Sequence, residues 1–327
     1  MNTSSNSSSL RFVDAGTVAR NLPFAELIEA LRKAFAATDL TAPARNHYGL
    51  DGLGSGSPVL LSMPAWSGRL GIGTKLVTVY PDNHKLGLPS IHGVYVLMDA
   101  ATGRPEAVFD AGELTARRTA AASALASRFL SRPDSRALLM LGTGRLSSVL
   151  PLAHAAVRPL ERVLVWGRSA DKARDTALLL QSQGMAAEPV ASLEQACAEA
   201  DIVSCATLSS VALLQGDWLK PGTHVDLVGA FTPKMREADD RVLARADAVW
   251  CDTTQGVLAE GGDVVQALAS GALDAKRIRG ELADLCRAAQ APARAQQDIT
   301  VFKSVGAALE DLVAARLCLD RLTAQPV

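Results

Sequence analysis

Short apolar runs alternate with amphipathic segments through the second half of the chain. Such mostly apolar segments predict strands at Ala137–Leu141, Arg162–Trp166, Ala200–Thr207 and His224–Gly229, and the first of them is apolar throughout. A strand that reads as an uninterrupted apolar run is typical of a parallel sheet covered on both faces. The alternation therefore predicts an α/β fold, with a Rossmann-type doubly wound parallel sheet domain over residues 116–304.

The first third of the chain has a mixed pattern. It predicts one helix followed by three short strands, at Pro23–Ala37, Val59–Met63, Leu70–Val79 and His92–Asp99. A last amphipathic segment, Val305–Leu322, predicts a helix that we assign to the same region. We expect these parts to form a smaller α+β domain for substrate binding and dimerisation, made of residues 1–115 and 305–327.

A glycine turn follows the first predicted parallel strand. Gly142 and Gly144 come directly after that strand and precede an amphipathic segment, Leu146–Val157, which is predicted to be helical. In dinucleotide-binding folds the first glycine permits the tight turn, and the second lets the backbone approach the pyrophosphate. The N–H groups of the new helix then face that anion. Ser147 stands at the third glycine position, so the motif departs from the strict pattern, but its context favours a nucleotide site over an ordinary strand–helix turn.

The end of the second parallel strand bears on the choice of coenzyme. Folds that select NAD usually carry a carboxylate there, which binds the ribose 2′-hydroxyl. Here Arg168 and Ser169 follow the strand, and Lys172 lies one turn into the next helix. These groups suit a 2′-phosphate, so we predict that NADP(H) is preferred and NAD(H) is the second choice. The alternative is that Arg168 and Lys172 are only solvated charges.

Composition narrows the class of protein. The chain has 327 residues, enough for two domains, and a hydrophobic content of 48%. Its 33 basic and 34 acidic residues give a formal net charge of −1, which argues against a nucleic-acid partner. The five cysteines are scattered without metal-ligand spacing, so we expect no metal site and a reducing, cytoplasmic compartment. No run reaches membrane-spanning length, and Met1–Ser9 is polar, which predicts a frayed tail rather than a signal peptide or anchor.

Three basic residues are candidates for substrate binding. Lys75 lies inside an otherwise apolar strand, where a buried ammonium would need a partner and would lose its proton readily. Arg117 and Arg118 are adjacent on a predicted helix, so at most one of them can enter a given site. Arg45 lies on a predicted loop. The pattern alone favours a solvated strand face for Lys75 and ordinary surface charge for Arg45.

Several segments together match a known family. They are Met63-Pro64, Gly73–Lys75, Tyr80–Asn83, Asp99–Gly103, Leu114–Ala120, the Gly142 turn and Asp298–Gly306. On these segments the chain resembles the ornithine cyclodeaminase/mu-crystallin family of NAD(P)-dependent enzymes over nearly its whole length. The resemblance implies a homodimer whose first domain supplies both the interface and the substrate pocket. It also implies that Arg45, Lys75 and Arg118 hold the substrate carboxylate, with Lys75 as the catalytic residue that keeps the imine protonated or relays the proton.

The predicted coenzyme contacts fall mostly at the ends of the parallel strands. They are Ser90, Arg118, Gly142, Gly144, Arg145, Leu146, Arg168, Ser169, Lys172, Thr207, Val225, Asp226, Leu227, Val228 and Ser304.

One departure indicates a branch of the family. Where true ornithine cyclodeaminases carry an aspartate that binds the substrate's side-chain amine, this chain has Phe231. An aromatic ring cannot pair with an ammonium, and the surrounding sequence resembles the reductases of Δ1-pyrroline-2-carboxylate and Δ1-piperideine-2-carboxylate. We therefore expect reduction of a cyclic imino acid to L-proline or L-pipecolate. The alternatives are an ornithine cyclodeaminase or alanine-dehydrogenase-like enzyme, and a non-catalytic NADPH-binding protein like mu-crystallin.

Overall fold

The computed structural model describes residues 10–324, except the side chain of His84, so the predicted tail Met1–Ser9 lies outside the described residues. The described chain forms two compact units. The first comprises residues 10–23, 39–115 and 308–324, and the second comprises residues 24–38 and 116–307. No helix among the described residues is both long and apolar enough to cross a membrane.

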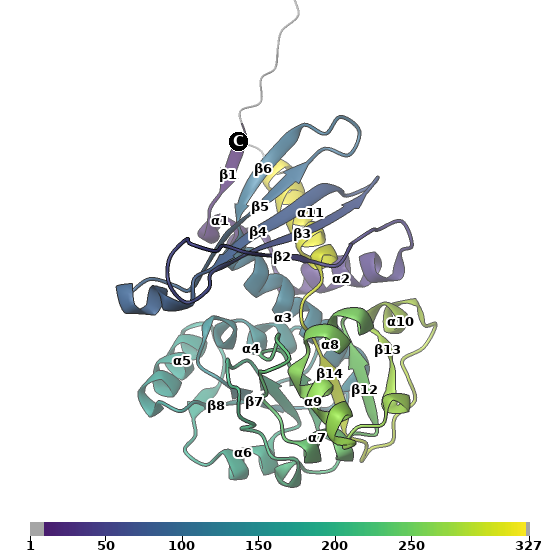
Figure 1. Ribbon diagram of the computed structural model, residues 1–327. Coiled ribbons are helices and arrows are strands. Elements are labelled where there is room, and N and C mark those ends of the chain that lie inside the picture. The colour runs from purple at the N-terminus through teal and green to yellow at the C-terminus, as the bar shows by residue number, and fades with distance from the viewer. Residues whose placement is uncertain (1–9, 325–327) are drawn as a thin grey trace, which may run out of the picture. The chain divides into compact units, whose positions relative to one another are not determined.

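The first unit is a six-stranded sheet with helices packed on one face (Figure 1). Its elements are β1 (Arg11–Val13), α1 (Ala15–Asn21), β2 (Asn46–Gly49), β3 (Val59–Ser67), β4 (Gly71–Val79), the 3-10 helix η1 (Pro81–Leu86), β5 (Ile91–Met98), β6 (Pro105–Asp110) and α11 (Ala308–Ala324). The strand order is β1-β6-β5-β4-β3-β2, and all neighbours are antiparallel except β1 and β6. The C-terminal helix α11 packs against β3, β4 and β5.

Strand β3 is longer than the predicted strand Val59–Met63, because it continues through Pro64. Proline has no N–H to donate, so it is tolerated only where a strand lacks a neighbour on that side. The register shows why it fits here, since β2 pairs with β3 only as far as Ser62, whereas β4 pairs with it throughout. Strand β2 therefore does not reach Pro64, and the next pairing on this side of β3 is the bridge between Thr41 and Trp66.

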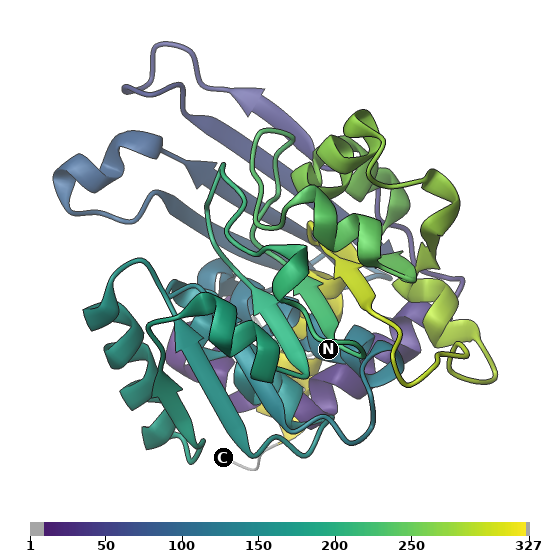
Figure 2. The same cartoon turned by 90° about the horizontal axis from the view of Figure 1, so that it is seen from below.

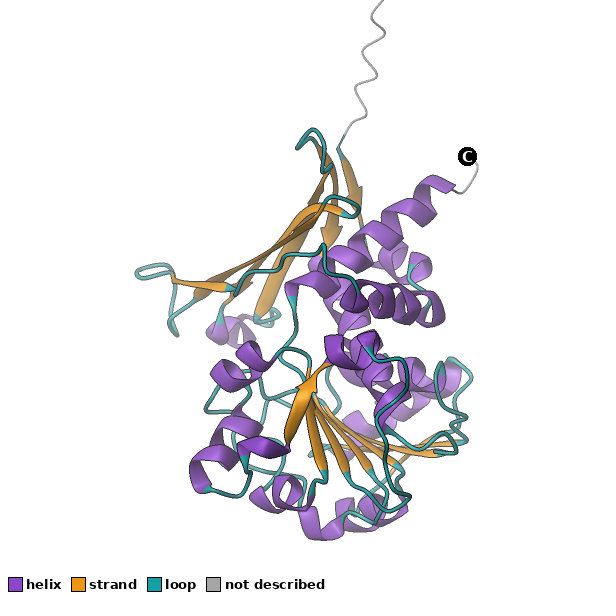
Figure 3. Cartoon of the chain, turned by 90° about the vertical axis from the view of Figure 1, so that its right-hand side faces the viewer, coloured by secondary structure: helices purple, strands orange, loops and turns teal. Residues whose placement is uncertain are grey.

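The second unit is an eight-stranded sheet in which all neighbouring strands are parallel, with helices on both faces (Figure 3). Its elements are α2 (Phe24–Ala36), most of α3 (Ala111–Leu130), β7 (Ala137–Leu141), η2 (Arg145–Ser148), α4 (Leu150–Ala155), β8 (Arg162–Trp166), α5 (Ala170–Ser182), β9 (Ala187–Pro189), α6 (Leu193–Glu199), β10 (Ile202–Cys205), η3 (Gly216–Trp218), β11 (His224–Leu227), α7 (Asp240–Arg245), β12 (Ala248–Cys251), α8 (Thr254–Glu260), α9 (Gly262–Ser270), η4 (Ala275–Arg277), β13 (Ile278–Glu281), α10 (Leu282–Arg287) and β14 (Thr300–Lys303). The order β13-β12-β14-β11-β10-β7-β8-β9 places the late strand β14 inside the sheet (Figure 2). The predicted doubly wound α/β fold is confirmed.

Two expectations about the helices need correction. Helix α2 was placed in the first domain, but it belongs to the second unit, where it packs against α10 and α4. The helix predicted over Leu146–Val157 is split into the 3-10 helix η2 and the short α4. Pro151 sits in the first turn of α4, where its missing N–H is tolerated, so a new helix starts there instead of continuing from η2.

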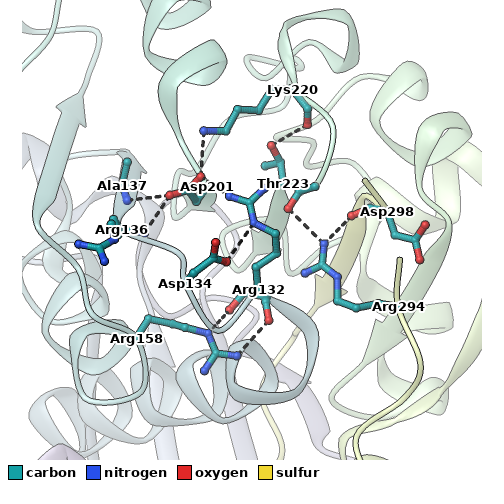
Figure 4. A network of polar contacts seen from close by, with 12 residues as sticks. Arg132, Asp134, Arg136, Ala137, Arg158, Asp201, Lys220, Thr223, Arg294 and Asp298 are labelled. Atoms are coloured by element: carbon teal, nitrogen blue, oxygen red, sulfur yellow. Dashed lines mark hydrogen bonds and ion pairs between the residues drawn. The ribbon is translucent and has the colours of Figure 1, made fainter. Parts of the chain in front are cut away.

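A polar network fastens the amino-terminal edge of the parallel sheet (Figure 4). The Asp201 carboxylate accepts hydrogen bonds from the backbone N–H groups of Arg136 (2.8 Å) and Ala137 (3.1 Å), at the start of β7. It also pairs with Arg132 (2.7 Å) and Lys220 (2.8 Å). These contacts give this edge a structural role and leave the opposite, carboxyl-terminal edge for ligands, as in other open parallel sheets.

Candidate functional site

The turn after β7 has the shape that a pyrophosphate needs. Gly142 has a φ of 125°, and a Cβ at this position would lie 2.5 Å from the carbonyl oxygen of Ala206, so only glycine fits. A Cβ built on Gly144 would meet no atom within 4 Å, so the backbone is open on that side. Arg145 begins the 3-10 helix η2 and is exposed beside this opening.

Ser147 shows how the turn manages without a third glycine. Its side chain is buried, and its hydroxyl donates a hydrogen bond to the Gly144 carbonyl at 2.6 Å. The serine therefore closes the turn on its inner side, while its neighbour Leu146 remains half-buried. The turn geometry thus fits the pyrophosphate of a dinucleotide.

The loop after β8 presents cationic side chains to solvent. Arg168 and Lys172 are exposed, and Ser169 caps α5 by accepting a hydrogen bond from the Lys172 N–H at 3.4 Å. The Ser169 hydroxyl therefore has a capping role in addition to the predicted coenzyme contact. The nearby carboxylate of Asp171 pairs with Arg174 at 3.0 Å, one turn further along the helix.

The side chains of three predicted coenzyme contacts on β11 lie inside the second unit. Val225, Asp226 and Leu227 are fully buried inside the sheet, between β10 and β14, so these side chains have no surface for a ligand. The Asp226 carboxylate accepts hydrogen bonds from Ser204 (2.7 Å) and Ser123 (2.9 Å), which gives it a structural role. Val228 follows the strand and is also buried, and the first exposed side chain after it is that of Phe231.

Three positions mark the carboxyl ends of the central strands. Thr207 follows β10, Val228 follows β11 and Ser304 follows β14. Backbone hydrogen bonds join these ends, from the Val228 N–H to the Cys205 carbonyl (2.9 Å) and from the Ser304 N–H to the Leu227 carbonyl (3.1 Å). The chain therefore presents these residues at one edge of the sheet, next to the Gly142 turn on β7.

The buried carboxylate of Glu237 lies at the same carboxyl-terminal edge of the sheet, and no role was predicted for it. Glu237 is fully buried, and it accepts hydrogen bonds from the Thr207 N–H (2.6 Å), the Thr207 hydroxyl (2.9 Å) and the Gly229 N–H (2.6 Å). No short sequence motif marks Glu237 as a functional residue. Thr207 lies 30 residues before it in the sequence, and Gly229 lies eight residues before it in a segment without regular secondary structure.

The first unit contains a buried lysine, contrary to the solvated strand face that the pattern favoured. The Lys75 side chain is 4% exposed, and its ammonium pairs with the Asp311 carboxylate on α11 at 2.8 Å. The Thr115 hydroxyl lies 3.3 Å from the same nitrogen. Asp311 is itself fully buried, so each ion offsets part of the desolvation cost of the other.

A buried tyrosine pairs with Lys75 across the sheet. Tyr95 on β5 is opposite Lys75 in the strand register, and its hydroxyl occupies the space that a side chain at Gly73 would need. Burial raises the pKa of Tyr95 well above its ordinary value, and the nearby Asp311 carboxylate acts in the same direction. The phenol is therefore neutral, and the charges of this cluster belong to Lys75 and Asp311.

The adjacent arginines of α3 point in different directions. The Arg117 guanidinium lies 5.2 Å from the centre of the Phe24 ring. Arg118 is buried instead, and a Cβ built on Gly306 would lie 2.6 Å from one of its guanidinium nitrogens. Gly306 also has a φ of 87°, so glycine is required there both for the backbone and for the arginine.

The predicted site residues are divided between the two units. Arg45 is half-buried just before β2, and Ser90 lies just before β5 with its carbonyl accepting the Tyr80 N–H at 2.8 Å. These two residues and Lys75 belong to the first unit, whereas Arg118 and the strand-end positions belong to the second. Phe231 is on the loop after β11, also in the second unit, and is 37% exposed.

The chain is similar to known proteins along its whole length. The family model described as "Ornithine cyclodeaminase/mu-crystallin family" matches residues 13–325. A Δ1-pyrroline-2-carboxylate reductase of Paracoccus denitrificans is 38% identical over 312 residues, which is 94% of this chain and 96% of the relative.

Solved structures agree with this fold. The Δ1-pyrroline-2-carboxylate reductase of Thermococcus litoralis, in complex with NADH and L-proline, superposes with a TM-score of 0.89 at 28% identity, covering 96% of this chain and 98% of that one. The iminosuccinate reductase of Paracoccus denitrificans, in complex with NAD+, superposes with a TM-score of 0.83 at 26% identity, covering 96% of both chains. The chain therefore belongs to the ornithine cyclodeaminase/mu-crystallin family, as its motifs predicted.

Proposed function

We propose that this protein is a nicotinamide-dependent reductase of small cyclic imino acids, which converts Δ1-pyrroline-2-carboxylate, Δ1-piperideine-2-carboxylate or both to L-proline and L-pipecolate. The observation that carries the proposal is the end-to-end similarity to a Δ1-pyrroline-2-carboxylate reductase, at 38% identity. The open glycine turn after β7 and the aligned strand ends support a dinucleotide in the second unit.

The coenzyme supplies the hydride when it is bound, and the protein supplies orientation and charge. A cyclic imino acid carries a carboxylate, which the guanidinium groups of Arg45 and Arg118 can bind in a bidentate manner. Lys75 adds an ammonium whose proton can be held at, or passed to, the imine nitrogen. The Asp311 carboxylate holds the Lys75 ammonium at 2.8 Å, and we propose that this ammonium is the proton donor.

Phe231 favours reduction over deamination. A cyclodeaminase must bind the side-chain ammonium of a linear diamino acid, which requires a carboxylate or similar acceptor. The loop after β11 offers an exposed aromatic ring at that position. A flat apolar surface suits the ring of a cyclic imine and gives an ammonium no anion.

The direct test of this function is an assay of coenzyme oxidation over a panel of substrates. We expect rapid oxidation of NADPH with the two cyclic imino acids, and little or none with pyruvate plus ammonia or with iminosuccinate. A protein that binds NADPH but oxidises it with none of these substrates would instead support the non-catalytic alternative.

Coenzyme choice follows from the loop after β8. Arg168 and Lys172 are exposed cations, so we infer a preference for NADPH over NADH. Arg168→Asp should reverse the preference, because its carboxylate repels the 2′-phosphate and can accept from the ribose 2′-hydroxyl of NADH. The measurement is the ratio of kcat/KM for the two coenzymes. A wild type that uses both equally, with an unchanged ratio in the variant, would contradict this preference.

The uncovered face of the first unit's sheet supports a homodimer. Strand alternation places Phe12, Trp66, Leu76 and Val94 on the face opposite α11, and these side chains are 36–64% exposed. An apolar sheet face of this kind is typical of a protein interface. We propose that two copies of the chain associate through this face.

Leu76→Glu should therefore convert the dimer to a monomer, because it places a charge in the centre of the face. Light scattering after gel filtration should give about twice the 34.3 kDa chain mass for the wild type and the single mass for the variant. Leu178→Glu is the matched control, since this leucine is also exposed (55%, against 38% for Leu76) but lies on α5 of the second unit. Equal masses for wild type and Leu76→Glu would exclude this interface.

A further inference from the structure

The Glu237 carboxylate joins two loops at the carboxyl edge of the parallel sheet. Its Oε1 accepts both hydrogen bonds from Thr207, and its Oε2 accepts the bond from the Gly229 N–H. A Cβ at Gly229 would collide with Glu237 and Thr207, at 2.4 Å and 2.1 Å, so the three residues fit closely. One side chain thus fixes the backbone after β10 and after β11.

Three further groups around Glu237, those of Asp263, Lys303 and Cys205, are fully buried. The Asp263 carboxylate accepts the backbone N–H of Glu237 at 2.7 Å and pairs with the Lys303 ammonium at 3.0 Å. The Cys205 thiol, on the neighbouring strand β10, is also fully buried. Burial raises the pKa of Glu237 to about 7, while Lys303 opposes this shift and Asp263 reinforces it.

Asp201 makes a comparable bridge at the opposite edge of the sheet, with a different outcome. Like Glu237, it is buried and accepts two backbone N–H groups, but it pairs directly with Arg132 and Lys220. The bonds from Lys220 and from the two backbone N–H groups outweigh partial burial, so the pKa of Asp201 is lowered. Two similar carboxylate bridges therefore differ in whether they change charge near neutral pH.

We propose that Glu237 is a positioning residue of the coenzyme site, which holds Thr207 and Gly229 in the binding arrangement only when its carboxylate is ionised. This inference rests on the proposed coenzyme site of the second unit. Glu237 lies at the ends of β10 and β11, beside the point between β7 and β10 where the strand order reverses, which is where such sheets bind dinucleotides.

The number of hydrogen bonds that Glu237 can accept explains why its ionisation matters. An ionised carboxylate can accept all three bonds from Thr207 and Gly229. When a proton is added, the hydroxyl oxygen becomes a weaker acceptor and its O–H needs an acceptor of its own. The two N–H groups cannot provide one, so the Thr207 hydroxyl must turn to accept or one of the donors must move away. Either change loosens or reorients Thr207. The ionised carboxylate of Glu237 should also raise the affinity for the oxidised coenzyme relative to the reduced one. The oxidised nicotinamide ring carries a positive charge, whereas the reduced ring is neutral.

The test is the dissociation constant of the oxidised and reduced coenzymes between pH 6 and pH 8.5, measured by calorimetry on the full chain. Since coenzyme binds the ionised form, affinity should fall as pH decreases through about 7, by about tenfold at pH 6. The fall should be larger for the oxidised coenzyme. Glu237→Gln should bind about tenfold more weakly than wild type at pH 8 and should lack this part of the pH dependence.

Asp201→Asn provides the matched control, because it removes the corresponding bridge at the other edge. It should lower thermal stability but keep the wild-type pH dependence of coenzyme affinity. Titration of the coenzyme's own phosphates is common to all variants and cancels in the comparison.

A wild-type affinity that is flat over this pH range, or a Glu237→Gln profile that matches wild type, would overturn the role of Glu237 while leaving the coenzyme site intact. The flat profile is decisive even if Glu237→Gln does not fold. A wild type that binds neither coenzyme at any pH would instead overturn the proposed function itself.

Discussion

Lys75→Met is expected to abolish most of the imine reductase activity and to destabilise the protein. The substitution removes a proton donor, and positioned acid catalysis contributes about 10²- to 10⁴-fold in rate. It also leaves the fully buried Asp311 carboxylate without its ammonium partner, which costs roughly 3–5 kcal/mol of unfolding free energy. The measurements are kcat in the coenzyme-oxidation assay and the denaturant midpoint.

The double variant Lys75→Met/Asp311→Asn separates these two effects. Asp311→Asn removes the buried charge that the single variant leaves unpaired, so the double variant should recover much of the lost stability. Activity should stay low, because the proton donor is still absent. Recovery of activity together with stability would show that Lys75 has only a structural role.

Arg118→Met is expected to reduce kcat/KM for the cyclic imino acid about 30- to 150-fold, because one charge-assisted bidentate contact is worth roughly 2–3 kcal/mol. Coenzyme affinity should change much less, provided that the arginine acts on the substrate carboxylate. Steady-state kinetics and coenzyme titration on the same preparation measure both quantities.

The neighbouring residue supplies the control for this experiment. Arg117→Met removes the same charge from the same helix, but Arg117 lies over the Phe24 ring and points away from Arg118. It should therefore have near-normal kinetics. Equal losses in the two variants would indicate a general effect on α3 and remove Arg118 from the substrate site.

The features that could be predicted from sequence are those set by local pattern. The strands β7 and β8 have the predicted bounds, Ala137–Leu141 and Arg162–Trp166, because each contains at least four consecutive apolar residues followed directly by glycine. The glycine turn could be located for a similar reason, since Gly142 needs both a positive φ and the space that a Cβ would fill, and a short motif records that requirement.

The features that were missed depend on contacts between distant parts of the chain. The helix over residues 24–36 was recognised, but only its packing against α10 and α4 assigns it to the second unit. The burial of Lys75 depends on Asp311 in the C-terminal helix, and a strand pattern cannot show that partner. Likewise, the sequence suggests that Asp226 is a polar residue available to a ligand. In the structure its carboxylate is buried and accepts hydrogen bonds from the hydroxyl groups of Ser123 and Ser204.

The central claim is that this chain reduces cyclic imines and does not deaminate ornithine. The most direct measurement compares two reactions of the wild-type enzyme, with product analysis of each. One contains Δ1-pyrroline-2-carboxylate with NADPH, and the other contains L-ornithine with catalytic NAD+. We expect L-proline in step with coenzyme oxidation in the first, and no ammonia in the second. Robust ammonia release from ornithine, with proline formed and no net use of coenzyme, would contradict the assignment.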